Sequence, residues 1–223
     1  MREDLAAFID HTFLRPDAVR ADFTQLCKEA VQHSFATVCV NSAHVALCTS
    51  LLADCQLPIT ATVGFPLGAG NSAGKAAEAA QAVLDGASEI DMVCQIGALK
   101  DGLRDVFIDD VRGVVDAADG GLVKVILETS LLTDDEKRRG AQWTRIAGAA
   151  FVKTSTGFGG GAATEDDVRL LRAETGSDFG VKASGGIRDA AAADRMIAAG
   201  ANRLGTSASV AIVTESSMQD RGY

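Results

Sequence analysis

The chain has 223 residues, 47% of them hydrophobic, and a mass of 23.1 kDa, which suits one domain with a single substantial core. Its net charge of -9 and sequence pI near 4.8 argue against nucleic acid or an anionic membrane surface as the main partner. Any anionic substrate must therefore bind in a local pocket of positive charge.

Cysteine usage and the first residues of the chain point to a cytoplasmic setting. The chain starts with acidic residues where a signal peptide has a basic region, and no run of about 18 apolar residues occurs. The cysteines are odd in number and lack C-x-x-C spacing, so neither a disulfide framework nor a zinc site is predicted: they are Cys27, Cys39, Cys48, Cys55 and Cys94. We expect a protein with reduced thiols that does not enter a membrane.

Short apolar runs alternate with alanine-rich segments of helical periodicity along the chain. Such alternation is typical of parallel βα units. The runs predict eight strands, over residues 8–12, 37–40, 59–64, 89–94, 122–128, 151–154, 180–184 and 203–206. The clearest helical segments are residues 75–84, 108–118, 165–174 and 190–199, and Thr164 is the expected N-cap of the third of these.

No linker or change in composition divides the eight units, so residues 1–223 are expected to form one domain. The simplest architecture is a closed (β/α)8 TIM barrel, with the polar residues 214–223 as a C-terminal tail. An open doubly wound sheet is the alternative, because strand order is not visible in a sequence. In a barrel, functional residues are expected at the carboxyl ends of the strands.

Two lysines stand inside apolar strand segments, each directly before small residues and glycine. They are Lys153 in FVKTSTG and Lys182 in VKASGG. A buried ammonium group is costly unless it is paired or loses its proton, and two adjacent ammonium groups lower each other's pKa. This pattern favours a nucleophilic amine, while structural ion pairs are the alternative. Lys124 also lies in an apolar strand but is followed by no glycine turn, so a structural role is expected for it.

An acid inside an apolar strand provides a possible partner for these lysines. Asp91 lies in EIDMV, where it could move protons beside a lysine or act as a fixed ion-pair partner. His11, His33 and His44 show no metal-ligand spacing, so no metal site is expected.

Glycine turns follow the last three predicted strands. The turns at Gly185-Gly186 and Gly205-Thr206-Ser207 occupy the loops where barrels of this class often bind phosphate, and Thr156-Gly157 lies beside them. The alternative is that these are ordinary turns without a role in binding. The glycines after Phe158 do not form the fingerprint of a dinucleotide-binding loop.

Seven segments spread over the chain match the motifs of one known family: residues 9–12, 62–66, 89–93, 97–99, 123–129, 151–157 and 180–186. On these motifs the sequence resembles the 2-deoxyribose-5-phosphate aldolases, class I lyases that use a lysine Schiff base on a (β/α)8 barrel. The resemblance implies reversible cleavage of 2-deoxy-D-ribose 5-phosphate to D-glyceraldehyde 3-phosphate and acetaldehyde. It also implies a place in deoxynucleoside and carbohydrate catabolism and no metal or organic cofactor.

The same resemblance implies roles for individual residues. Lys153 forms the imine, Lys182 is the ammonium group that tunes it, and Asp91 takes part in proton transfer. The phosphate is held by Gly185, Gly186 and Ser207 with the turn at Thr156-Gly157, and Tyr223 folds over the site. Gly205 is a further candidate for substrate binding, because it stands in the glycine turn that ends the eighth unit. Asp10 and Cys39, at the ends of the first two strands, are candidate accessory residues, and a homodimer is the candidate assembly.

Two other functions fit the same residues. One is a barrel enzyme acting on phosphorylated sugars in which the lysines stabilise an enolate. The other is a sugar-phosphate sensor that catalyses nothing.

Overall fold

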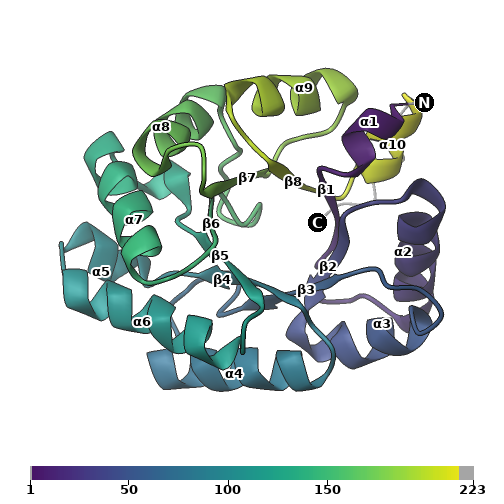
Figure 1. Cartoon of the computed structure of the whole chain (residues 1–223), viewed down its shortest axis with the longest axis horizontal. Coiled ribbons are helices and arrows are strands. Elements are labelled where there is room, and N and C mark those ends of the chain that lie inside the picture. The colour runs from purple at the N-terminus through teal and green to yellow at the C-terminus, as the bar shows by residue number, and fades with distance from the viewer. Residues whose placement is uncertain (1, 216–223) are drawn as a thin grey trace.

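A computed structural model describes residues 2–215, which form a closed barrel of eight parallel strands ringed by helices (Figure 1). The strands are hydrogen-bonded in chain order, and β1 pairs with β8 to close the ring. The barrel is therefore confirmed and the open sheet is excluded. The strands are β1 (Ile9–Phe13), β2 (Thr37–Asn41), β3 (Ile59–Val63), β4 (Glu89–Val93), β5 (Leu122–Ile126), β6 (Phe151–Lys153), β7 (Gly180–Ser184) and β8 (Arg203–Thr206).

The helices cover the outside of the strands. They are α1 (Glu3–Ala6), α2 (Arg20–His33), α3 (Val45–Leu51), α4 (Ser72–Leu84), α5 (Ile96–Lys100), α6 (Arg104–Ala117), α7 (Asp134–Ile146), α8 (Glu165–Thr175), α9 (Ala190–Ala199) and α10 (Ser209–Thr214), with short 3-10 turns η1 (Ser42–His44) and η2 (Thr129–Leu131). Among residues 2–215, no helix is long and apolar enough to cross a bilayer.

Most boundaries lie within a few residues of those expected, and the differences have local causes. The strands predicted to reach Gly64 and Glu128 end earlier because both residues have left-handed backbone angles, with φ of 61° and 57°. Helix α4 starts before the expected residue 75, because the Asn71 side chain accepts a hydrogen bond from the Gly74 amide and caps it. The Thr164 cap of α8 is confirmed by a bond of 3.0 Å from the Asp167 amide.

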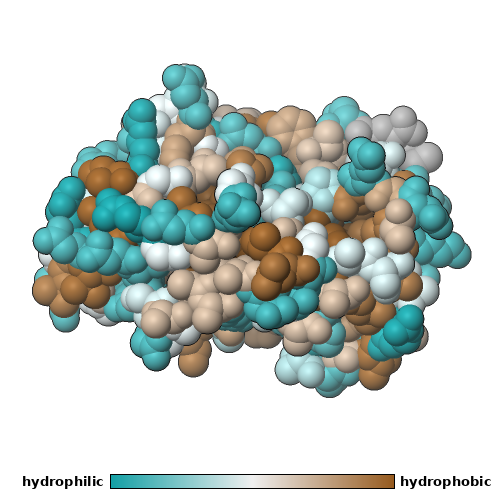
Figure 2. All heavy atoms as spheres, turned by 60° about the horizontal axis from the view of Figure 1, so that its bottom comes forward, coloured by the Kyte–Doolittle hydropathy of each residue, from teal (hydrophilic) through white to brown (hydrophobic). Residues whose placement is uncertain are grey.

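The two faces of the strands differ in polarity. Apolar side chains such as Val38, Ile90 and Val181 are fully buried in the hydrophobic core together with helix residues such as Phe23 and Leu171. Because side chains alternate along a strand, the positions between these apolar residues point into the barrel, and many of them are charged. On the outer surface, Figure 2 shows hydrophobic and hydrophilic residues interspersed over the face that lies at the bottom of Figure 1.

One buried ion pair joins helices α4 and α6 behind the barrel wall. Lys75 donates to Asp110 at 2.7 Å and to the Val93 carbonyl at 2.9 Å, and neither side chain is more than 2% exposed. The Ser72 hydroxyl donates to the second oxygen of Asp110 at 2.9 Å. Gly64, at the end of β3, packs on the aliphatic part of Lys75. The pair therefore supports the ends of β3 and β4 from behind.

Replacing Asp110 with alanine should strongly destabilise the fold. The Lys75 ammonium would stay buried without its carboxylate, and breaking such a pair costs about 3–5 kcal/mol. We expect urea unfolding to show a fall of this size in the free energy of unfolding. The double variant Lys75→Met/Asp110→Leu removes both charges and should lose clearly less. A single variant within about 1 kcal/mol of the parent chain would contradict the prediction.

Candidate active site

Seven charged side chains from six different strands converge inside the barrel. Most are completely buried, and each touches a partner of opposite charge. The cationic members are Lys124 on β5, Lys153 on β6, Lys182 on β7 and Arg203 on β8; the acidic members are Asp10 on β1 with Glu89 and Asp91 on β4. We call this set the ion cluster.

Asp91 lies at the centre of the ion cluster. One of its oxygens accepts a hydrogen bond from Lys124 at 2.9 Å. The other accepts from both Lys153 and Lys182, each at 2.7 Å. The structure thus brings together the three residues expected to carry the chemistry, and the two lysines lie opposite each other on neighbouring strands.

The deeper part of the cluster is a chain of alternating charges. Asp10 contacts Lys182 and accepts a hydrogen bond from Arg203 at 2.7 Å. Glu89 in turn contacts Arg203 at 3.2 Å and Lys124 at 2.5 Å. Lys124 is therefore an internal ion-pair partner, as expected from its sequence context. Asp10 is in direct contact with Lys182, which places this accessory residue next to the lysine pair.

The two lysines differ in pKa, and the expectation that each lowers the other is wrong for Lys182. Burial alone would lower the pKa of Lys182, but the carboxylates of Asp10 and Asp91 outweigh burial and raise it above its ordinary value. Lys182 is therefore an ammonium group at neutral pH. Sequence reasoning missed this because the contact with Asp10 joins the first and seventh strands.

Lys153 shows the opposite shift. Burial is the main cause that lowers its pKa, the Asp91 carboxylate opposes this, and the charge of Lys182 lowers it further. The ion cluster also has four cationic and three acidic side chains, so loss of one proton leaves it neutral. Lys153 is thus the lysine that can be a free amine, a choice that the sequence alone left open.

Asp91 and Cys39 have fixed protonation states at neutral pH. Burial would raise the pKa of Asp91, but the three lysines around it hold that pKa well below the ordinary range. Asp91 is therefore a carboxylate that orients the lysines. Burial raises the pKa of Cys39 to about 11, so it is a neutral thiol beside the lysine pair.

Gly205 does not lie in the loop where it was expected. It is part of β8, paired with Asp10 and Ser184 on the neighbouring strands. A side chain here would begin 3.1 Å from the Cε atom of Lys182 and 3.0 Å from the Cβ atom of Ser184. The absence of a side chain at Gly205 therefore leaves room for Lys182. The expectation that Gly205 lies in a phosphate-binding loop is corrected, because the residue belongs to β8.

The loops after β7 and β8 are joined at the barrel mouth. The Thr206 hydroxyl donates to the Ile187 carbonyl at 2.7 Å, which ties the end of β8 to the turn at Gly185-Gly186. Both glycines have positive φ, 90° and 77°. Within residues 2–215, the backbone amides of Gly185, Gly186 and Ser207 donate to no other described residue. Such a group of N–H donors suits an anion.

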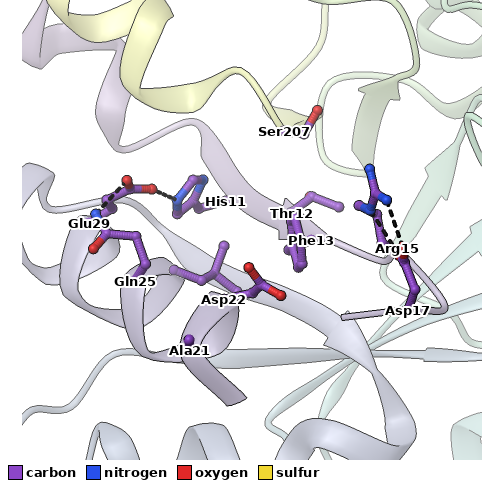
Figure 3. A pocket seen from close by; sticks show the side chains of 11 residues that line it. His11, Thr12, Phe13, Arg15, Asp17, Ala21, Asp22, Gln25, Glu29 and Ser207 are labelled. Carbon is purple, nitrogen blue, oxygen red and sulfur yellow. Dashed lines mark hydrogen bonds and ion pairs between the residues drawn. The ribbon is translucent and has the colours of Figure 1, made fainter. Parts of the chain in front are cut away.

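Ser207 also borders a pocket of about 500 Å³ beside β1 and α2, seen in Figure 3. His11 lines this pocket and lies 3.0 Å from Glu29 and 2.9 Å from the Ser209 hydroxyl. Arg15, another lining residue, pairs with Asp17 at 2.7 Å. His11 therefore links β1 to α2 and α10. Among residues 2–215, no group of three or more His, Cys, Asp or Glu side chains is placed to hold a metal ion.

The turn after β6 is held by an acid that sequence reasoning did not single out. The Thr156 hydroxyl donates to Glu128, and the Thr156 amide does the same at 3.2 Å. The Phe158 amide donates to the Thr156 hydroxyl at 3.0 Å. Thr156 is thus engaged within its own loop, while Gly157 turns with a φ of 85°. The signal in the sequence was an acid at the end of an apolar strand.

Tyr223 lies outside the described residues.

Comparison with known proteins identifies the family. A family model described as DeoC/LacD family aldolase matches residues 5–212. The chain is 54% identical to deoxyribose-phosphate aldolase 1 of Bacillus licheniformis, over 96% of each chain. It is 52% identical to the deoxyribose-phosphate aldolase of Bdellovibrio bacteriovorus, over 98% of this chain and 99% of that one.

Solved structures agree with the sequence relatives. The deoxyribose phosphate aldolase of Aeropyrum pernix, described as a tetramer, superposes with a TM-score of 0.89 and is 33% identical. The match covers 96% of this chain and 91% of that one. With a family model that spans nearly the whole barrel, this chain belongs to the DeoC/LacD family of aldolases.

Proposed function

We propose that this chain cleaves 2-deoxy-D-ribose 5-phosphate reversibly to D-glyceraldehyde 3-phosphate and acetaldehyde, through an imine on Lys153. The observation that supports it best is the buried amine of Lys153, whose pKa is lowered while the neighbouring Lys182 keeps its proton. The curated relatives in the same family are named deoxyribose-phosphate aldolases.

The first steps follow from this difference in protonation. The free amine of Lys153 attacks the C1 aldehyde of the open-chain sugar, and loss of water leaves a protonated imine. The carboxylate of Asp91 lies 2.7 Å from the Lys153 nitrogen and remains its counterion. Lys182, an ammonium group on the same carboxylate oxygen, can give a proton to the departing water.

Cleavage then uses the imine as the electron sink. A base removes the proton of the C3 hydroxyl, the C2–C3 bond breaks and glyceraldehyde 3-phosphate leaves. The electron pair of that bond forms an enamine on Lys153. Protonation at C2 and hydrolysis release acetaldehyde and restore the amine. We assign proton transfer to Lys182, while Asp91 stays a carboxylate that orients both lysines and Asp10 keeps Lys182 charged.

The phosphate group is proposed to bind where the β7 and β8 loops meet. The amides of Gly185, Gly186 and Ser207 supply donors there, and Gly157 borders the same mouth from β6. With a protonated imine on Lys153, the ion cluster has one surplus positive charge beneath these loops, which favours an anion in a protein that is otherwise acidic.

Two further proposals concern the setting of the enzyme. All five cysteines are free thiols, which supports a cytoplasmic location because thiols stay reduced there. We also propose a homodimer, whose mass in light scattering would be twice that of the 23.1 kDa chain.

Borohydride trapping tests the central step. Incubation with deoxyribose 5-phosphate and borohydride should reduce the imine and leave a stable adduct on Lys153, which peptide mapping locates. Lys153→Leu should give no adduct and no turnover, whereas Lys137→Leu, which changes a lysine on α7, should behave as the parent chain. Turnover without an adduct would favour the enolate mechanism, and tight binding without turnover would favour a sensor.

The pH dependence tests the role of Lys182. Removing its charge in Lys182→Met should raise the pKa of Lys153, so the acidic limb of kcat/KM should move to higher pH. Loss of a proton donor should also lower kcat by about 100- to 10,000-fold. Lys182→Arg keeps the charge, so its acidic limb should stay in place even if its rate falls. An unmoved limb in Lys182→Met would show that Lys182 does not tune Lys153.

A negative charge at Ser207 tests the phosphate site. Ser207→Asp should raise KM for deoxyribose 5-phosphate by about 10- to 100-fold, because like charges would face each other. Unphosphorylated deoxyribose should be turned over as by the parent chain. Ser50→Asp, which places the same charge on exposed α3, is the control. An equal loss with both sugars would place the phosphate elsewhere.

A further inference from the structure

The loop between β6 and α8, residues 154–164, runs across the mouth of the barrel. Near its end, the Ala163 amide donates to the Gly185 carbonyl at 3.0 Å, beside the proposed phosphate loops. In its middle, Gly159 passes so close to Glu128 that a Cβ atom there would lie 2.8 Å from the carboxylate. Gly161 similarly lies against Ser130. The loop thus lies on the end of β5.

At the residue before Gly159, the same loop reaches across to the loop that follows β3. The ring of Phe158 contacts the ring of Phe65, which follows β3, with centroids 5.3 Å apart and planes at 86°. Strands β3 and β6 are three positions apart in the closed ring, with β4 and β5 between them. The pair therefore spans the carboxyl ends of β4 and β5, the strands that carry Asp91 and Lys124.

Both rings are carried by backbone that is fixed from below. The Phe158 amide donates to the Thr156 hydroxyl, which itself donates to buried Glu128. On the other side, the Gly64 amide before Phe65 donates to Glu78 at 2.9 Å, and Gly64 packs on Lys75 of the buried ion pair. The edge-to-face contact thus joins two anchored loops, and Phe158 remains 41% exposed on the solvent side.

The position of the pair relative to the substrate rests on the proposed function. With the phosphate at the β7 and β8 loops, the sugar extends from Lys153 toward those strands. The C1 and C2 atoms, which become acetaldehyde, then form the end of the sugar farthest from the phosphate, beside Lys153 and Asp91. The two rings span the carboxyl end of the strand that carries Asp91.

We propose that Phe65 and Phe158 form an aromatic bridge over the donor side of the site and limit the donor to a short, unbranched aldehyde. Acetaldehyde carries only a methyl group beyond its carbonyl and fits beneath the rings. A longer alkyl group at this position would meet ring carbons. The bridge is a determinant of donor size and takes no part in proton transfer.

The test is the donor preference in the direction of synthesis. With glyceraldehyde 3-phosphate as acceptor, kcat/KM is measured for acetaldehyde and for propanal in Phe158→Ala, Phe65→Ala and the double variant. The ratio of kcat/KM for propanal to kcat/KM for acetaldehyde should rise about tenfold or more in each single variant. This is the discrimination that one methylene group produces in an apolar pocket. Because both rings form one bridge, the double variant should gain less than the product of the single gains.

Control variants separate the bridge from general loosening of the loop. Leu67→Ala shortens a side chain that is 73% exposed in the same loop as Phe65, and its ratio should equal that of the parent chain. Phe158→Leu and Phe65→Leu keep an apolar side chain and should raise the ratio by a smaller factor. Should the alanine variants fail to fold by circular dichroism, the leucine variants carry the test.

The outcomes distinguish this inference from the proposed function. An unchanged ratio in folded, active variants of both phenylalanines would overturn the bridge while leaving the aldolase reaction intact. A parent chain that adds no acetaldehyde to glyceraldehyde 3-phosphate would overturn the proposed reaction and the bridge with it. An equal rise in Leu67→Ala would assign the preference to the loop as a whole and overturn the role of the rings.

Discussion

The carboxylate of Asp91 is the contact on which the interior of this barrel depends. Three lysine nitrogens from β5, β6 and β7 converge on its two oxygens at 2.7 to 2.9 Å. Without this acid, the barrel would hold several buried cations with too few partners, and an unpaired buried charge is among the costliest features a fold can contain. The same contact holds the two lysines of neighbouring strands at one point. Structural stability and the arrangement of the two lysines therefore have a common origin in this carboxylate.

Because the barrel interior is polar, the apolar residues that stabilise the fold lie mainly in the layer between the strands and the helices. Apolar residues such as Val38, Ile90 and Val181 fill that layer, and the Lys75–Asp110 pair reinforces it behind β3 and β4. Hydrogen bonds to two further acids hold the loops at the barrel mouth. Glu128 holds the loop after β6, and Glu78 holds the turn after β3. The loops at the mouth are thus hydrogen-bonded to acids beneath them, buried Glu128 and half-buried Glu78, and can carry binding groups without being loosely attached.

Much of the fold and the centre of the site could be predicted from the sequence, because both depend on local patterns. Eight alternating βα units indicate a barrel, and a lysine or aspartate inside an apolar strand stands out as a buried charge. What could not be predicted depends on residues that meet only when the ring closes. Asp10 reaches Lys182 across the junction of the first and last strands, Gly205 makes room for the same lysine, and Phe65 meets Phe158 across two intervening strands. The spacing of residues along the chain gives no indication of such contacts.

The lysine pair shows why this matters for chemistry. Lys153 and Lys182 occupy similar motifs and matching positions on adjacent strands, so a sequence pattern treats them alike. Their pKa values shift in opposite directions because Lys182 has two carboxylate partners, Asp10 and Asp91, and Lys153 has only the second. Burial lowers the pKa of both lysines, and the second carboxylate at Lys182 reverses the direction of the shift there. The difference between the two lysines therefore depends on an acid on β1, which is separated from the strand of Lys153 by β7 and β8 in the closed ring.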